Sequence, residues 1–163
     1  MPTARAIERA RRDRRQGKSP STQAGEFVRE EIEKVRAGEH GVRSVKQAIA
    51  IGLSEARRAG VKLPASKTAN AETRRKAKQD SAAVGRKPSR KRAQATLKAL
   101  RRESTSTVSR AALSKQAKSA AKKRGAGERS AAARKAVRTK GPAGRSVAAK
   151  KAARTRARRG RAK

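Results

Sequence analysis

The chain has 163 residues, of which 48 are Lys or Arg and 12 are Asp or Glu, so its formal net charge is +36. Ordinary soluble globular domains carry a net charge of about 2–8. The excess excludes that class and predicts a polyanionic partner, for which nucleic acid is the most abundant source in a cell. The chain contains no cysteine, which excludes disulfides, thiolate zinc sites and cysteine nucleophiles.

Large apolar side chains are too few for a large core. Val, Ile, Leu, Met and Phe account for 20 residues, or about 12% of the chain. A highly charged chain with less than roughly 20% of such residues is expected to be disordered. Eleven of the twenty lie between residues 20 and 64. The sequence therefore predicts a mainly α protein, with a small helical hairpin and a long basic C-terminal tail that is largely disordered or conditionally helical.

Charge divides the chain in the opposite way. Residues 1–64 carry 15 basic and 8 acidic side chains, whereas residues 65–163 carry 33 basic and 4 acidic ones. The predicted domains are a basic N-terminal helix or arm (1–18), a helical hairpin module (19–64) and a nucleic-acid-binding tail (65–163).

The first helix of the hairpin is predicted at about residues 20–36. Ser19 is placed to cap it, Pro20 suits the first helical position, and Gly38 supplies the stop. Apolar residues recur at the i, i+3, i+4 spacing of one helix face. This face consists of Ala24, Phe27, Val28, Ile32 and Val35.

The second helix is predicted to follow a short loop at 37–43. Ser44 begins a capping box in which Gln47 reaches back. Gly60 ends the helix in the left-handed conformation, with Val61 available to pack onto the last turn. Gly52 would allow the two helices to approach closely. The apolar stripe consists of Val45, Ala48, Ile49, Gly52, Leu53 and Ala56.

The tail contains an internal repeat. RSAAARKAVRTK (129–140) recurs as RSVAAKKAARTR (145–156), offset by 16 residues. Serines at the start of each copy are placed to cap short alanine-rich helices, and glycines separate the copies. Further helical patches are predicted at about 90–102 and 108–124. The STSTVS segment (104–109) between them is interpreted as a linker, in which phosphorylation would lower the local positive charge.

The density of Lys and Arg in the tail predicts binding by phosphate neutralisation. Such binding releases condensed counterions and weakens steeply with salt. The candidate nucleic-acid-binding residues are Lys115, Lys118, Lys122, Lys123, Arg124, Arg129, Arg134, Lys135, Arg138, Lys140, Arg145, Lys150, Lys151, Arg154, Arg156, Arg158 and Arg159.

Base recognition has little support in the sequence. Single-strand and RNA modules stack bases on aromatic side chains, and Phe27, the one aromatic residue, has core spacing. A sequence-reading helix-turn-helix is the alternative for the hairpin. Its exposed face would offer Lys46, Arg57 and Arg58, but little that reads bases.

Catalytic and metal-binding patterns are absent from the sequence. Basic residues interleave the acidic ladder of Glu26, Glu30 and Glu33, so we interpret the ladder as a solvated face. His40, the single histidine, is expected to be a solvated turn residue. We therefore expect no enzyme activity, no cofactor and no metal.

The segment FVREEIEKVRAGEHGVRSVKQAIAIGLSEARRAG (27–60) resembles a small bacterial domain of unknown function. Its hallmark is a KQAIAIALSEA-like stretch after a helix and a short glycine-containing loop. Residues 46–56 match this stretch, with Gly52 where alanine is usual. The resemblance carries no known activity and so implies no site residues. The tail is similar in composition to the Lys/Ala-rich tails of bacterial linker-histone-like proteins, which implies DNA binding with little sequence preference.

The expected function is that of a nucleoid-associated, histone-like protein that binds and compacts duplex DNA without sequence preference. An RNA-binding or ribosome-associated basic protein is the alternative, because ribosomal extensions share this composition. No apolar run approaches the ~18 residues of a membrane span, so we expect no membrane partner and a cytoplasmic, nucleoid-associated location. The apolar stripes are wide enough for a homodimer through the 20–62 hairpin, although nothing in the sequence fixes a symmetry.

Overall fold

The computed structural model describes residues 2–66, 69–86 and 88–160, without the side chain of Arg159. The protein is mainly α, and the described residues form helices and connecting turns without a strand. Contacts divide the chain into two compact units, residues 1–116 and 117–163. The division of the chain into domains at 1–18, 19–64 and 65–163 stays a prediction, because it was made from charge and motif and the compact units do not test it.

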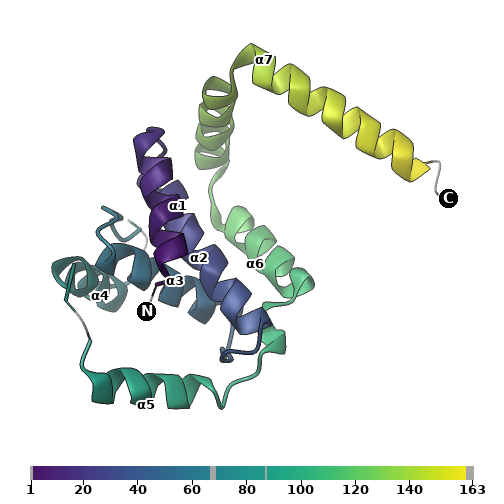
Figure 1. Cartoon of the computed structure of the whole chain (residues 1–163). Helices are drawn as coiled ribbons and strands as arrows, with labels where there is room; N and C mark the ends of the chain where they lie inside the picture. Colours follow the sequence, from purple (N-terminus) through teal and green to yellow (C-terminus); the bar gives the residue numbers. More distant parts are fainter. Residues whose placement is uncertain (1, 67–68, 87, 161–163) are drawn as a thin grey trace. The chain divides into compact units, whose positions relative to one another are not determined.

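Three helices build the first unit's centre (Figure 1). They are α1 (Ala4–Arg15), α2 (Pro20–Arg36) and α3 (Val45–Arg58). Both predicted hairpin helices are thus confirmed. α1 packs against α2, and α2 packs in turn against α3. The hairpin is therefore not the whole folded module, because α1 covers it.

The ends of α3 follow the local sequence signals. Ser19 precedes α2 as predicted, but its side chain makes no capping hydrogen bond. The Ser44 hydroxyl accepts a hydrogen bond from the Gln47 N–H at 3.3 Å, and the Gln47 side chain reaches back to the N–H of Arg43 at 2.8 Å. The capping box is confirmed, with its return bond one residue earlier than expected. At the other end of α3, Gly60 has φ +91°, and the Val61 N–H donates to the Ala56 carbonyl at 3.0 Å.

α2 and α3 touch through their backbones at Gly52. A Cβ at this position would lie 2.6 Å from the Cα and 2.8 Å from the N of Val28. Real Cβ atoms do not approach backbone so closely, so only glycine permits this crossing. The predicted close approach of the helices is confirmed.

The core is built mainly from small residues. Its first cluster joins α1, α2 and α3 and centres on Phe27. The second lies at the α2–α3 turn and includes Val35, Val42 and Val108. The fully buried core alanines are Ala6, Ala24, Ala48 and Ala56. Alanine buries little surface per residue, but its small side chain brings helices close enough to fill the interior.

The tail is helical, which corrects the expectation of a long disordered segment. It contains α4 (Ala71–Ala82), α5 (Arg90–Leu100), a 3₁₀ turn η1 (Ser106–Val108), α6 (Arg110–Lys123) and α7 (Ala126–Gly160). Two causes favour helix here. Alanine has the highest helix propensity, and polar side chains cap helix starts, as Asn70 does by accepting from the Thr73 N–H at 2.8 Å.

The repeats form two helical stretches within α7 (Figure 1). The break between them is at Gly141, whose φ is +63°, followed by Pro142. Ser130 and Ser146 lie inside these stretches, so the prediction that they cap separate helices is wrong. α7 already begins at Ala126, where the Arg129 N–H donates to the Gly125 carbonyl at 3.1 Å.

Candidate nucleic-acid interface

The predicted cations of α6 and α7 are exposed to solvent. In the stretch 129–160 there are twelve Lys and Arg residues, and the sequence from 129 onward contains no Asp or Glu. No acid within that stretch can therefore neutralise them. The exposed candidates are Lys115, Lys118, Lys122, Lys123, Arg124, Arg129, Arg134, Lys135, Arg138, Lys140, Arg145, Lys150, Lys151, Arg154, Arg156 and Arg158. The side chain of Arg159 lies outside the described side chains.

These cations do not share one helix face. With 3.6 residues per turn, Arg134, Lys135 and Arg138 lie on one side of their helical stretch and Arg129 and Lys140 lie on the opposite side. The second repeat copies the pattern. Exposed residues cover nearly the whole of α7. The helix thus lacks the apolar stripe that a surface helix needs for packing on a protein core. A helical stretch with cations on two opposite sides can meet phosphates on either side.

Two predicted binding residues also stabilise the helix breaks. The Arg129 guanidinium donates to the Arg124 carbonyl at 2.8 Å, and Arg145 donates to the Gly141 carbonyl at 3.3 Å. Both carbonyls lie where the regular helical bonding is interrupted. These arginines have a structural role in addition to their charge.

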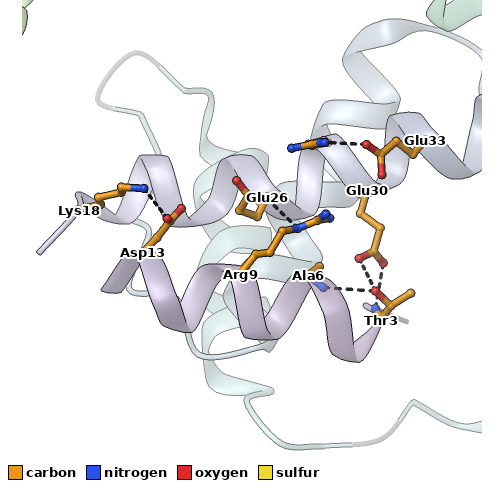
Figure 2. Close-up of polar contacts among 9 residues, drawn as sticks. Thr3, Ala6, Arg9, Asp13, Lys18, Glu26, Glu30 and Glu33 are labelled. Carbon is orange, nitrogen blue, oxygen red and sulfur yellow. Dashed lines mark hydrogen bonds and ion pairs between the residues drawn. The ribbon is translucent and has the colours of Figure 1, made fainter. Parts of the chain in front are cut away.

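The first unit, in contrast, uses its acids to pair cations and to hold its helices together (Figure 2). Arg9 of α1 lies 2.9 Å from the carboxylate of Glu26 on α2. Lys18 Nζ lies 2.7 Å from the buried carboxylate of Asp13. The acidic ladder therefore faces α1 at Glu26 and Glu30, which corrects its interpretation as a solvated face. Glu33 alone remains half-exposed, paired with Arg29 at 2.9 Å.

Glu30 ties the start of α1 to the middle of α2. Its carboxylate accepts from the Thr3 N–H at 2.9 Å and from the Thr3 hydroxyl at 2.6 Å (Figure 2). Lys34 Nζ lies 2.8 Å from the same carboxylate. Burial alone would raise the pKa of Glu30, but the hydrogen bonds from Lys34 and Thr3 outweigh it and lower the pKa.

His40 is buried, with 8% of its surface exposed, so its expected role as a solvated turn residue is wrong. Its Nδ1 lies 3.2 Å from the Gly41 carbonyl, and its Nε2 lies 3.6 Å from the buried carboxylate of Glu31. Burial raises the pKa of Glu31, while the neighbouring His40 works in the opposite direction. Among the described residues, no cluster of His, Asp or Glu could hold a metal ion.

The hairpin presents few cations for reading bases. Arg57 is buried and donates to the Leu63 carbonyl at 2.9 Å. Arg58 is half-buried, whereas Lys46 is exposed. Only one of the three side chains considered for a helix-turn-helix is thus freely presented to a ligand.

Two further cationic surfaces lie outside the residues that the sequence predicts to bind nucleic acid. The outer side of α1 exposes Arg5, Arg11, Arg12, Arg14 and Arg15. Near its C-terminal end, α5 carries a shallow groove lined by Gln94, Leu97, Lys98, Arg101 and Arg102. The signal that could have found both is the local density of arginine and lysine, which is high there as well as in the repeats.

A segment from beyond the hairpin docks on the α2–α3 turn. The Gly41 N–H donates to the Leu100 carbonyl at 3.0 Å, and the Val42 N–H donates to the Ser104 carbonyl at 3.1 Å. The Thr107 hydroxyl donates to the Val42 carbonyl at 2.8 Å. We call residues 100–108 the docked segment. Part of the presumed STSTVS linker is thus an ordered contact.

Val108 anchors the docked segment. Its side chain is fully buried with Val35, Val42 and Ala48, beside Ile32 and Ile51. Arg36 holds its backbone by donating to the Val108 carbonyl from Nε at 3.3 Å and from Nη2 at 3.1 Å. We call this surface the acceptor site; it consists of residues 32–51 of α2, the turn and α3.

Comparison with known families gives a match to the N-terminal part of the chain. Residues 2–67 match DUF6496, a family of unknown function. An uncharacterised domain is therefore supported over α1, α2 and α3, and it covers less than half of the chain. No match was found among curated proteins or among solved structures. In the described part of the chain, no helix is both long and apolar enough to cross a membrane.

Proposed function

We propose that the chain binds duplex DNA without sequence preference, through phosphate neutralisation by α6 and α7. The observation that carries the proposal is the stretch 129–158, in which every Lys and Arg lies exposed on helix and no acid occurs. Duplex DNA carries one negative charge per ≈ 1.7 Å of axis. Helices with cations on opposite sides suit contact with phosphates, which position a protein but carry no sequence information directly.

In this proposal the protein is a nucleoid-associated, histone-like binding protein rather than an enzyme. The acids of the first unit support a division of labour, because they pair with cations inside that unit and leave α7 uncompensated. Structured RNA is the alternative polyanion, since an RNA backbone offers the same phosphates. The proposal favours DNA because the chain lacks stacking aromatics apart from the buried Phe27.

A salt titration of the full chain tests the proposal. The logarithm of the binding constant falls with the logarithm of salt by about 0.9 per phosphate contacted. Replacing five exposed α7 cations by Gln should therefore flatten the slope by up to about 4.5. The five are Lys150, Lys151, Arg154, Arg156 and Arg158.

The matched control removes the same charge from the first unit, with Gln at Arg5, Arg11, Arg12, Arg14 and Arg15. It should change the slope much less. Two duplexes of unrelated sequence should bind equally, and structured RNA should bind more weakly. If the α1 variant flattens the slope as much as the α7 variant does, the assigned interface is wrong. Tighter binding of RNA would assign the alternative partner.

A further inference from the structure

The docked segment and its acceptor site are separable parts of the first unit. The acceptor residues lie within the stretch 2–67 that matches the family, whereas the docked segment lies more than thirty residues beyond it. Between them, α5 buries none of its residues. Earlier on the path, α4 packs against α3 and buries Ala77 and Asp80. The part of the path that adds no packing between the two parts is therefore α5.

The contacts between the two parts are local. They comprise backbone hydrogen bonds at Gly41 and Val42, the Thr107 hydroxyl, the Arg36 guanidinium, the Arg43–Glu103 ion pair and the buried Val108 side chain. None of these contacts involves α4, and α5 takes part only through its last residue, which belongs to the docked segment. The same contacts would form unchanged if the docked segment came from another molecule.

From this separability we infer that the acceptor site is a peptide-binding site, which the docked segment of a second copy of this chain can occupy. The product is an exchanged dimer, in which two copies donate residues 100–108 to each other. Exchange of an identical element is a low-cost route to dimers because it creates no new contact. It differs from the predicted dimer through the apolar stripes of 20–62, a range without any exposed large hydrophobic side chain.

Concentration decides which copy supplies the segment. A flexible tether holds its end at an effective concentration in the millimolar range or below, and this value falls as the tether lengthens. At comparable protein concentrations, docking between molecules competes with docking within one. The exchange itself requires no nucleic acid. If the chain binds DNA as proposed, copies on DNA would be concentrated locally, and an exchanged dimer could bridge two duplexes. Only this consequence rests on the proposed function.

Single-cysteine chains provide the test, since the protein has no cysteine of its own. Arg43 Nε lies 3.5 Å from the Glu103 carboxylate across the docking contact, and the two side chains are 80% and 30% exposed. One chain carries Arg43→Cys and the other carries Glu103→Cys. The two are mixed in equal amounts at millimolar concentration without nucleic acid and treated with a short thiol-specific bifunctional cross-linker.

Exchange predicts far more heterodimer than random collision gives. Collision alone yields the statistical mixture of heterodimer and homodimers, whereas trans docking brings the thiol at position 43 of one chain only to the thiol at position 103 of another. Adding Gly41→Ala to the Arg43→Cys chain should remove the excess, because a Cβ there would overlap the Glu103 carbonyl of the docked segment. Gly25→Ala is the matched control, since nothing lies within 4 Å of a Cβ at that position.

A second variant protects the test against misfolding of the acceptor. Val108→Asp in the Glu103→Cys chain removes the anchor and leaves the acceptor residues untouched, so it should abolish the excess as Gly41→Ala does. A heterodimer yield at the collision level in the unblocked mixture would overturn the inference. So would an excess that survives both Gly41→Ala and Val108→Asp. Neither result would bear on the salt titration of DNA binding, so the two proposals fail separately.

Discussion

Replacing Gly52 by Ala tests whether backbone contact between α2 and α3 sets the stability of the module. A Cβ at this position would lie 2.6 Å from the Cα of Val28 and 3.0 Å from its Cγ2. The first neighbour is backbone and cannot rotate away, so the helices must separate. Overpacking of this kind costs about 1–3 kcal/mol. The higher helix propensity of alanine offsets about 1 kcal/mol of that cost.

Gly25→Ala serves as a control that separates the clash at position 52 from the gain in helix propensity that any Gly-to-Ala replacement brings. Gly25 lies on the exposed side of α2, with nothing within 4 Å of a Cβ, so its replacement should stabilise by about 1 kcal/mol. The two variants should therefore differ in unfolding free energy by about 1–3 kcal/mol. At roughly 4–8 °C per kcal/mol for a module of this size, the Tm values should be clearly resolved.

The assay follows the ring signals of Phe27 by NMR during thermal unfolding. Phe27 is the one aromatic residue and is buried among α1, α2 and α3, so its signals report this module and not the tail helices. Circular dichroism would combine the signals of this module and of the tail helices. If Gly52→Ala melts at or above the temperature of Gly25→Ala, the helices have room at their crossing and our reasoning about backbone contact is wrong.

Three further substitutions test the polar contacts and the docked segment. Glu30→Gln should destabilise the protein by about 1.5–3 kcal/mol at neutral pH. Because the pKa of Glu30 is lowered, the stability that its carboxylate contributes is lost as pH falls through that pKa. Urea unfolding should therefore show that the difference in unfolding free energy between wild type and variant becomes smaller in acid. Glu31→Gln should show the opposite pH dependence in the same measurement. Because the pKa of Glu31 is raised, the wild type loses stability as pH rises through that pKa, so the stability of the variant relative to the wild type should increase with pH. Val108→Ala removes two buried carbon atoms from the side chain and should destabilise the docking contact by about 1.6 kcal/mol or more. The loss should be seen as faster tryptic cleavage after Arg102. Unchanged cleavage would show that the Val108 anchor is dispensable.

Helix positions in this protein could be predicted because their signals are local. The cap at Ser44, the left-handed Gly60 and the 3.6-residue spacing around Phe27 act within one or two turns, and the structure contains the helices that they predict. Disorder in the tail was predicted from the shortage of large apolar residues. Helix formation by alanine does not require such residues, so the criterion failed there.

Long-range contacts could not be predicted in the same way. Val108 is a single valine among hydroxyl residues, and no periodicity marks it as a core residue. Its burial depends on the acceptor site, which lies far earlier in the chain. Glu30 and His40 were misjudged for a related reason, because their partners come from α1 and from across the turn. The exposure of the cations on α6 and α7 was predictable, since it depends on charge density and not on long-range contacts.

The alanine core has a consequence for how the protein tolerates change. Ala6, Ala24, Ala48 and Ala56 are completely enclosed, so every substitution except glycine adds atoms where no space exists. In a saturation mutagenesis these four positions should therefore rank among the least permissive in the first unit. The alanines of α7, which are almost all exposed, should accept most replacements. The same residue type would thus mark the most and the least constrained parts of one sequence.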